Sequence, residues 1–397
     1  TPLTHDPGAL MAGNFGDHQL GIYLASLGDA PPPEFPFDFA EWARRAEQTL
    51  PADVWDYVAG GAGDEGTQDA NVAAFARRGL MPRMLSGAAE RDLSVSLWGI
   101  DLPSPLLLAP VGVIGICTDD GHGDLAAARA SALTQVPFIG STLMQDPLED
   151  VAAACGETPA FFQLYTPRHR PLAESLVDRA ERAGYRAIVV TVDTWSLGYR
   201  PRDLAHGTFP QLSNLCLANY TSDPVFRSLL PDEADTNAIV GTWAGLFGDP
   251  SLTWDDLAWL RGLTDLPIVL KGICSPDDAR MAVDAGVDGI YCSNHGGRQA
   301  ASGPALEFLP GVVDAAGDLP VLFDSGVRSG VDAVKALALG ATAVGIGRPY
   351  AYAAAVGGTP AIEHLVRCML AEIDLTMGLN GYADLAALRA AGAFRID

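Results

Sequence analysis

A histidine and an arginine lie three residues apart in the stretch SNHGGRQ, residues 293–299, directly after an apolar segment. The imidazole of His295 can accept a proton near neutral pH, and a nearby carboxylate would stabilise the resulting cation. Arg298 carries a guanidinium group that can hold a carboxylate through two parallel hydrogen bonds. These residues favour proton removal beside a substrate carboxylate, with ordinary loop polarity as the alternative. The other histidines lie in regions expected to be a terminal arm, loops or helices, where a solvated side chain is expected.

Further ionisable residues follow other apolar segments. Together with His295 and Arg298 they form a set of six: Asp193, Lys271, His295, Arg298, Asp324 and Arg328. Packing a core does not require so many charges. Lys271 could form a Schiff base or act as a fixed positive charge beside a cofactor, whereas a surface lysine is the less favoured interpretation.

Eight short apolar segments from residue 105 onwards alternate with alanine-rich stretches of helical periodicity. Their ranges are 105–113, 137–142, 159–165, 186–194, 267–273, 289–295, 320–326 and 343–349. Continuous apolar strands are typical of a parallel sheet that is buried on both faces. Eight strand–helix units over about 250 residues predict an α/β fold of the (β/α)8 type, a TIM barrel. An open, doubly wound sheet is the alternative. In a barrel the carboxyl ends of the strands share one face, which would bring the six ionisable groups together.

The last two segments end in DSGVRSG and GIGRP, where glycines and arginines precede an expected helix start. Backbone N–H groups and helix dipoles at such places bind phosphate in many barrels. Glycines that merely turn the chain are the alternative. The phosphate could belong to a substrate or to a cofactor. No GxGxxG motif opens a βαβ unit, so a Rossmann-type nicotinamide site is not supported.

The remaining sequence divides into three further regions. Residues 1–37, which include DAPPPEFPF, have no clear periodicity and are expected to form an N-terminal arm. Residues 39–65 look helical and would form an extension before the barrel, which belongs to a unit of residues 38–397. Residues 195–250 form a long insert after the fourth strand, and loops of that length are usually lids or binding elements.

The composition excludes some classes of binding partner. The 397 residues carry 25 Lys and Arg against 49 Asp and Glu, a net charge of -24, which argues against nucleic acid or an anionic membrane as a partner. No apolar stretch is long enough for a membrane span, and the N-terminal residues lack the pattern of a secretion signal. The six cysteines are scattered without CxxC spacing, so we expect neither disulfides nor a metal site, and a cytoplasmic protein.

The sequence resembles the FMN-dependent 2-hydroxy acid oxidase family from about residue 40 to its end. The motifs that carry the resemblance are SNHGGRQ, TVDT, FFQLY, LKGI, DSGVRSG and GIGRP, each at the end of an expected strand. Within the family, the sequence is most similar to the bacterial lactate 2-monooxygenases, through YVAGGAGDE, GLMPRML, DGHGD, RPRDL, DPVF, GLFG and the long insert. The resemblance implies FMN as cofactor.

The resemblance also implies residue roles. His295 would be the base, with Asp193 as its partner and Tyr165 near the substrate hydroxyl. Lys271 would lie beside the flavin ring. The substrate carboxylate would bind the set Tyr57, Arg200 and Arg298, near Leu143. The cofactor would contact Pro110, Val111, Gly112, Ser141, Gln163, Thr191, Lys271, Ser293, Asp324, Gly326, Arg328, Gly347 and Arg348.

Three positions qualify the resemblance. Leu143 replaces the tryptophan of glycolate oxidase, and Gly112 replaces an alanine of many oxidases; both are monooxygenase-like. Met144 departs from the monooxygenases, so it could reshape the side-chain pocket or simply fill a gap.

The expected activity is therefore oxidation of an L-2-hydroxy acid, favouring L-lactate, with O2. A monooxygenase would give acetate, CO2 and water, whereas an oxidase would release keto acid and H2O2. A dehydrogenase that uses a quinone or protein acceptor would share every site residue, and a larger hydroxy acid is the alternative substrate. A non-enzymatic flavin-binding protein is disfavoured, because filling a core does not need the charged set. The resemblance also implies a homotetramer or homo-octamer.

Overall fold

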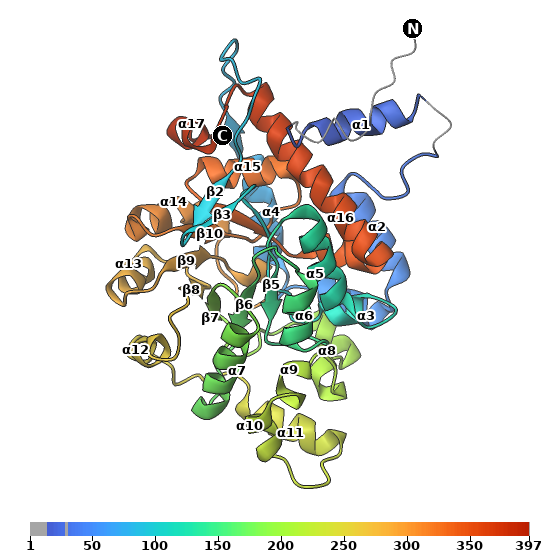
Figure 1. Ribbon diagram of the computed structural model, residues 1–397, viewed down its shortest axis with the longest axis vertical. Coiled ribbons are helices and arrows are strands. Elements are labelled where there is room, and N and C mark those ends of the chain that lie inside the picture. Colours follow the sequence, from blue (N-terminus) through green and yellow to red (C-terminus); the bar gives the residue numbers. More distant parts are fainter. Residues whose placement is uncertain (1–13, 28–30, 397) are drawn as a thin grey trace.

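The computed structural model describes residues 14–27 and 31–396. Its centre is an eight-stranded parallel sheet in the order β4-β11-β10-β9-β8-β7-β6-β5 (Figure 1). The strands are β4 (Leu106–Leu108), β5 (Ile139–Ser141), β6 (Phe161–Leu164), β7 (Ile188–Thr191), β8 (Ile268–Lys271), β9 (Gly289–Cys292), β10 (Val321–Phe323) and β11 (Ala343–Ile346). A parallel bridge between Leu108 and Phe138 joins β4 to β5 and closes the barrel. The TIM barrel prediction is confirmed, and the open sheet is excluded.

Each of the eight predicted segments contains one of these strands, and every strand residue is buried. The strands are shorter than the segments because the polar residues beyond each strand belong to loops at the carboxyl ends. The surrounding helices are α5 (Gly123–Thr134), α6 (Leu148–Ala154), α7 (Arg170–Arg182), α12 (Asp256–Arg261), α13 (Pro276–Asp284), α14 (Ala305–Ala316), α15 (Gly330–Ala338) and α16 (Arg348–Leu379). Non-helical backbone at Gly357 and Gly358 divides α16 into two parts.

The helical extension differs from the prediction in one respect. Residues 39–65 hold two helices, α2 (Phe39–Thr49) and α3 (Ala52–Ala59), and α4 (Gly66–Ala76) follows. The break lies at Pro51, because a residue that precedes proline is driven out of the helical region. Leu50 is accordingly extended, with ψ of 145°. Helix α2 buries Trp42 and Ala46 on one face.

The expected arm also contains regular structure. Residues 17–25 form helix α1 (Asp17–Ala25), which lies on α16. Residues 1–13 and 28–30 of the arm lie outside the described residues. No sequence pattern indicated this helix because α1 is not clearly amphipathic: no residue in it is fully buried.

The insert occupies the end of the molecule opposite α1 (Figure 1). It consists of short elements: α8 (Pro201–His206), η3 (Pro210–Ser213), α9 (Ala218–Thr221), α10 (Pro224–Ser228) and α11 (Thr236–Leu246). Its apolar residues Cys216, Leu217, Tyr220, Phe226 and Trp243 are buried in the main core. The insert is therefore a packed part of the fold and not a loose loop.

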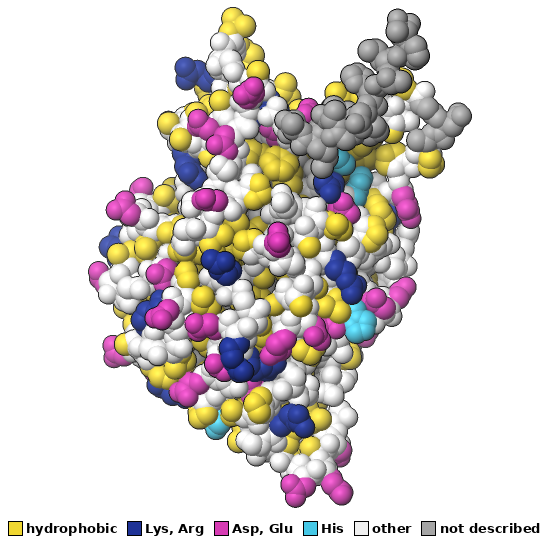
Figure 2. Space-filling view, in the orientation of Figure 1, with side chains coloured by type: hydrophobic (Ala, Val, Ile, Leu, Met, Phe, Trp, Pro, Cys, Tyr) yellow, Lys and Arg dark blue, Asp and Glu magenta, His cyan; other side chains and the backbone are white. Residues whose placement is uncertain are grey.

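Small elements complete the fold. β1 (Arg78–Leu80) pairs with β12 (Ala393–Arg395), and β2 (Val95–Leu97) pairs with β3 (Ile100–Leu102). The last helix is α17 (Leu385–Ala391), and two further turns are η2 (Ile114–Cys117) and η4 (His295–Gly297). All six cysteines are free thiols. Within the described ranges, no helix is both long and apolar enough to cross a bilayer. Acidic side chains on the face in Figure 2 are spread among basic and apolar ones.

A buried ion pair fixes α1 and the loop before β2 to α16. Asp374 on α16 is 1% exposed, and its carboxylate accepts a hydrogen bond from the Arg91 guanidinium at 2.8 Å. The same carboxylate accepts a hydrogen bond from the backbone N–H of Gly16, at 2.6 Å. Asp374 thus joins three segments that are far apart in the sequence.

Replacing Asp374 should therefore lower the stability of the protein. Asp374→Ala leaves Arg91 without its partner, and the free energy of unfolding should fall by about 3–5 kcal/mol. Asp178→Ala is the matched control, because Asp178 pairs with Arg182 on the exposed face of α7 and its loss should matter far less. Urea unfolding followed by circular dichroism measures both. Equal losses in the two variants would contradict the expectation.

Candidate functional site

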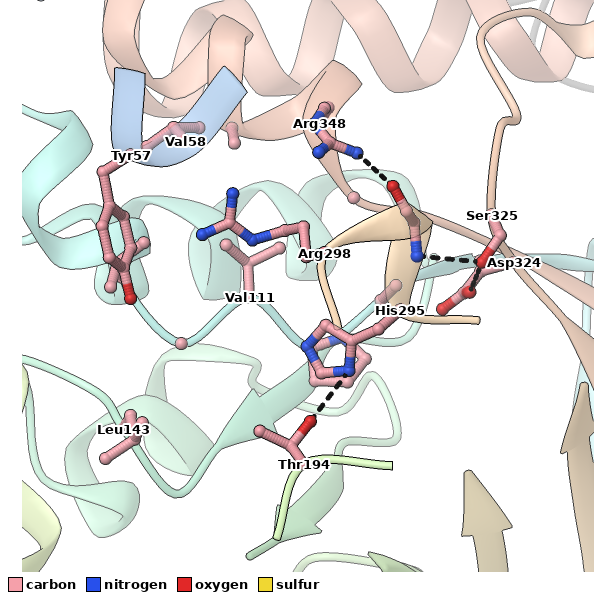
Figure 3. A pocket seen from close by; sticks show the side chains of 18 of the residues that line it. Tyr57, Val58, Val111, Leu143, Thr194, His295, Arg298, Asp324, Ser325 and Arg348 are labelled. Carbon is pink, nitrogen blue, oxygen red and sulfur yellow. Dashed lines mark hydrogen bonds between the residues drawn. The ribbon is translucent and has the colours of Figure 1, made fainter. Parts of the chain in front are cut away.

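A cavity opens at the carboxyl ends of the barrel strands, with about 1050 Å³ of empty space that is open to solvent. Most predicted site residues line it: Tyr57, Pro110, Val111, Gly112, Leu143, Tyr165, Arg200, Lys271, His295, Arg298, Asp324, Gly326, Arg328, Gly347 and Arg348. Figure 3 shows Tyr57 and Leu143 on one side, Arg348, Asp324 and Ser325 on the other, and His295 and Arg298 between them.

His295 and Asp193 form a pair at this cavity. The Nδ1 atom of His295 lies 2.9 Å from Oδ1 of Asp193 and 3.2 Å from Oγ1 of Thr194. Burial lowers the pKa of His295, and the neighbouring Asp193 carboxylate acts in the opposite direction. Burial would raise the pKa of Asp193, but His295 and Lys271 outweigh it and lower that pKa overall. The arrangement is a neutral imidazole beside a carboxylate anion.

An unusual turn positions the imidazole. His295, Gly296 and Gly297 all have left-handed backbone, with φ of 58°, 64° and 79°. Glycine accepts this conformation readily, whereas for histidine it is uncommon. The backbone N–H of His295 donates to Oγ of Ser293 at 3.1 Å, which holds the turn. A Cβ atom at Gly297 would lie only 2.6 Å from the backbone nitrogen of Gln68, so this position requires glycine.

Lys271 is 3% exposed and lies in a hydrogen-bonded row. Its Nζ donates to Oγ of Ser293 at 2.9 Å and lies 3.4 Å from a carboxylate oxygen of Asp324. Oγ of Ser293 in turn donates to Asp324 at 2.5 Å. This row places a fixed positive charge at the cavity wall, and the alternative of a surface lysine is wrong.

Three arginines bring more positive charge to the cavity. Arg298 donates to the carbonyl oxygen of Gly60, Arg348 to those of Gly60 and Gly296, and Arg328 to that of Val327. Burial lowers the pKa of Arg298 to about 9 and that of Arg348 to about 10, in each case helped by a neighbouring arginine. Burial also lowers the pKa of Arg328. A bound anion would stabilise the charged form of these buried arginines.

Arg200 differs from these three. Its Nε donates to the carbonyl oxygen of Arg298 at 2.9 Å, and a terminal nitrogen donates to Gln299 at 2.6 Å. Its other terminal nitrogen lies 3.6 Å from Asp203. Arg200 therefore supports the Arg298 backbone as well as lining the cavity.

The two predicted phosphate-binding ends are not equivalent. Helix α15 is capped by Ser329, and the N–H of Gly330 donates to Glu372, so its start is already occupied. Helix α16 has no side-chain cap at Gly347 and begins with Arg348. The anion site is thus best formed by the start of α16 and by the loop at Gly326 and Arg328, not by both helix starts.

Five predicted residues lie behind the lining. The side chain of Gln163 accepts from Oγ of Ser141 at 2.9 Å and donates to Oγ1 of Thr191 at 3.0 Å. These three side chains are buried and fix one another, so their outward polar atoms keep defined positions. Ser293 likewise fixes the position of Lys271 by a hydrogen bond, and Asp193 fixes that of His295.

Sequence reasoning missed several residues. Thr194 and Gln299 hold the Asp193 segment: Thr194 donates to the Asp193 carboxylate at 2.9 Å, and Gln299 to its backbone carbonyl at 3.1 Å. Both stand inside the quoted motifs TVDT and SNHGGRQ, so the signal was present. The insert adds residues that the sequence could give only as a range: Leu197, Phe209, Gln211 and Phe247. The side-chain amide of Gln211 is fully buried and has no hydrogen-bond partner among the described residues.

The cavity fits a phosphorylated flavin. The anion end has a buried Arg348 Nε that lacks a partner in the described part of the chain. The opposite wall offers an ammonium group at Lys271, which suits a polar edge of a flavin ring, and the buried amide of Gln163 lies behind that wall. Gly112 keeps the wall open, since a Cβ there would lie 3.3 Å from Cβ of Leu143.

Comparison with known proteins agrees with this geometry. The FMN-dependent dehydrogenase family matches residues 46–393. An L-lactate oxidase of Lysinibacillus sphaericus is 40% identical over 357 residues, which is 89% of this chain and 92% of that protein. A peroxisomal (S)-2-hydroxy-acid oxidase of Oryza sativa is 39% identical and covers 87% of this chain and 92% of its own length.

Among solved structures, a mandelate oxidase with (S)-4-hydroxymandelic acid superposes with a TM-score of 0.81. It is 36% identical and covers 91% of this chain and 99% of its own. With a family match over most of the chain and a cavity that fits the cofactor, the protein belongs to the FMN-dependent dehydrogenase family and is an FMN-dependent oxidoreductase.

Proposed function

We propose that the protein oxidises an L-2-hydroxy acid, with L-lactate as the preferred substrate, and that O2 is the final oxidant. We further propose that the keto acid reacts with the peroxide before it leaves, so that lactate and O2 give acetate, CO2 and water. The observation that carries the proposal is one cavity that holds the His295–Asp193 pair, the Arg298 guanidinium and a cover formed by the insert.

The substrate carboxylate binds Arg298 and the hydroxyl of Tyr57. The Arg298 guanidinium lies 5.0 Å from the centre of the Tyr57 ring, so the two side chains lie side by side in the cavity lining. Arg200 donates a hydrogen bond to the backbone carbonyl of Arg298 and adds a positive charge to the cavity. Burial raises the pKa of Tyr57, which keeps its hydroxyl a hydrogen-bond donor at neutral pH.

His295 removes one proton from the substrate through Nε2, the ring nitrogen that does not face Asp193. The Asp193 carboxylate stabilises the imidazolium cation that forms. Tyr165 donates a hydrogen bond near the substrate hydroxyl, and burial raises its pKa, so it stays protonated. Lys271, Arg328 and Arg348 would hold FMN in the cavity, where it would supply the acceptor for two electrons from the substrate and the route to O2.

A row of aromatic rings supports retention of the keto acid. Successive ring centres lie 6.4 Å apart from Tyr57 to Phe209, 6.0 Å to Trp243, 5.0 Å to Phe247 and 5.2 Å to Tyr165. The row connects the two substrate-binding tyrosines through the insert. We propose that this row slows release of the keto acid, since slow product release would favour the monooxygenase outcome over the oxidase outcome.

The second candidate is an oxidase that releases pyruvate and H2O2. The names of the lactate oxidase and hydroxy-acid oxidase relatives favour it. Both candidates share the same first half-reaction, so product analysis must separate them.

His295→Gln should abolish reduction of the flavin by substrate without loss of the cofactor. Removing a general base costs roughly 10²–10⁴-fold in rate. The rate of anaerobic flavin bleaching by L-lactate measures this. His122→Gln is the control, because His122 also pairs with a carboxylate, at 2.6 Å from Asp146, but lies outside the cavity lining. Bleaching of His295→Gln at the wild-type rate would disprove the base assignment.

The pH dependence follows from the lowered pKa of His295. Above this pKa the imidazole is neutral and can accept a proton; below it the ring is already protonated and inactive. We therefore expect kcat/KM to stay high from pH 8 down to about 6.5 and to fall only at lower pH. Asp193→Asn should move the fall to still lower pH, since Asp193 raises this pKa, and should also lower the maximal rate. A fall that begins above pH 6.5 would contradict this.

Product balance decides between the two candidates. Under air with L-lactate, we expect acetate and CO2 to appear in equal amounts and free H2O2 to be absent. Gas and organic-acid analysis with a peroxide assay measures all products together. Equal amounts of pyruvate and H2O2 would show an oxidase. Flavin bleaching without turnover under air would indicate another electron acceptor.

A further inference from the structure

Two histidines and a cysteine meet where α1 lies on α16, outside the lining of the flavin cavity. The Sγ atom of Cys368 lies 3.8 Å from Nε2 of His18 and 3.5 Å from Nε2 of His364. One ligand atom of each side chain lies within 4.8 Å of the other two. His18 and His364 are partly buried, so the expectation that they are solvated is wrong.

These distances match the spacing of ligands around zinc. With Zn–S of about 2.3 Å and Zn–N of about 2.0–2.1 Å, sulfur and nitrogen ligands at a tetrahedral angle lie roughly 3.5–3.6 Å apart. A set of two imidazoles and one thiolate favours zinc and similar borderline-soft cations over Mg²⁺ or Ca²⁺, which prefer oxygen.

The fold holds the three side chains in place. His364 and Cys368 are four residues apart on α16, a spacing that puts both on one helix face. His18 comes from α1, which is fixed two residues earlier by the hydrogen bond from Gly16 to Asp374. Aromatic rings enclose His364, with centres 5.7 Å away at Phe35 and 5.1 Å away at Phe37. The cluster is therefore preorganised and not a chance approach of loose side chains.

Charged groups near the cluster include the carboxylate of Glu372. A cation would replace the Cys368 thiol proton, which leaves to solvent. The other nearby charges, Glu363 and Arg367, pair with each other at 2.9 Å.

The carbonyl oxygen of Pro36 lies 3.1 Å from Nε2 of His364. Without a cation, that nitrogen can donate a hydrogen bond to the carbonyl. With a cation bound to Nε2, the carbonyl oxygen lies close enough to serve as a fourth, oxygen ligand. The alternative to a metal site is thus a set of hydrogen bonds around a protonated nitrogen, and the two differ in whether zinc binds.

We propose that His18, His364 and Cys368 form a binding site for a divalent cation of the zinc class, which ties helix α1 to helix α16. The site is structural: it joins the segment of residues 14–25 to the helix that begins with Arg348. It takes the metal by exchange of one proton for one cation and needs no other reactant.

Zinc binding to the full-length, FMN-loaded protein tests the site. The protein is stripped with a chelator and dialysed against buffered Zn²⁺, and zinc per chain is measured by elemental analysis. We expect one zinc per chain in the wild type. His18→Asn and Cys368→Ser should each weaken binding by more than the roughly 100-fold that loss of an outer-shell partner brings. His206→Asn is the control, since His206 pairs with Asp56 away from the cluster.

A second measurement uses the wild-type protein, so its result does not depend on whether a variant folds. Zn²⁺ should slow alkylation of Cys368 by iodoacetamide, measured by mass spectrometry of peptides, and leave Cys274, another partly buried thiol, unchanged. Absence of zinc from the wild type, equal zinc in wild type and His18→Asn, or unchanged alkylation of Cys368 would each overturn the proposal.

Discussion

Three arginine side chains at the carboxyl end of the barrel carry charge that the protein does not neutralise. Among the residues that the structure describes, none of Arg298, Arg328 and Arg348 forms an ion pair with a carboxylate; they donate to backbone carbonyl oxygens instead. Withdrawing a charge from water costs several kcal/mol per ion, and a lowered pKa is the sign of that cost. The closed barrel holds these groups in place, since its strand ends fix the loops that carry them. The two anions that we propose as ligands, a cofactor phosphate at one end and a substrate carboxylate at the other, would offset this cost.

The same surplus of positive charge favours a neutral imidazole at His295, in the pair that we propose as catalytic. Lys271 and Arg200 both lower the pKa of His295, and burial lowers it further, so that Asp193 is the group that pulls it back. A base that is buried among cations stays neutral and ready to accept a proton, but the cation that it forms would be unstable without the carboxylate. The left-handed turn at His295 therefore has a clear purpose: it points the ring toward Asp193 and keeps the other nitrogen on the cavity side. The charge state of His295 therefore depends on the surrounding cations as well as on Asp193.

Some of this could be predicted from sequence, for physical reasons that differ between elements. The barrel strands were predictable because burial on both faces leaves a continuous apolar run, as in residues 188–191 and 268–271, and because polar residues stop each run at the same face. Helix α1 was not, since it buries no residue fully and has no strong pattern. Pro51 itself signals the break between α2 and α3, but the apolar periodicity on both sides of it suggested one continuous helix. The contact between His18 and Cys368 joins residues 350 positions apart, and no local pattern reveals such a contact.

The insert shows why a range predicted from sequence can be right while its working residues remain hidden. Residues 195–250 are long enough to be a lid, yet length alone does not say which side chains face the cavity. Phe209 and Phe247 do so because the insert buries Trp243 between them, and that ring contacts both at 6.0 Å and 5.0 Å. We propose that the packing of this buried core sets how quickly a keto acid leaves the cavity. On that proposal, release that is slow relative to the reaction of the bound keto acid with peroxide would favour decarboxylation, and fast release would favour the oxidase outcome.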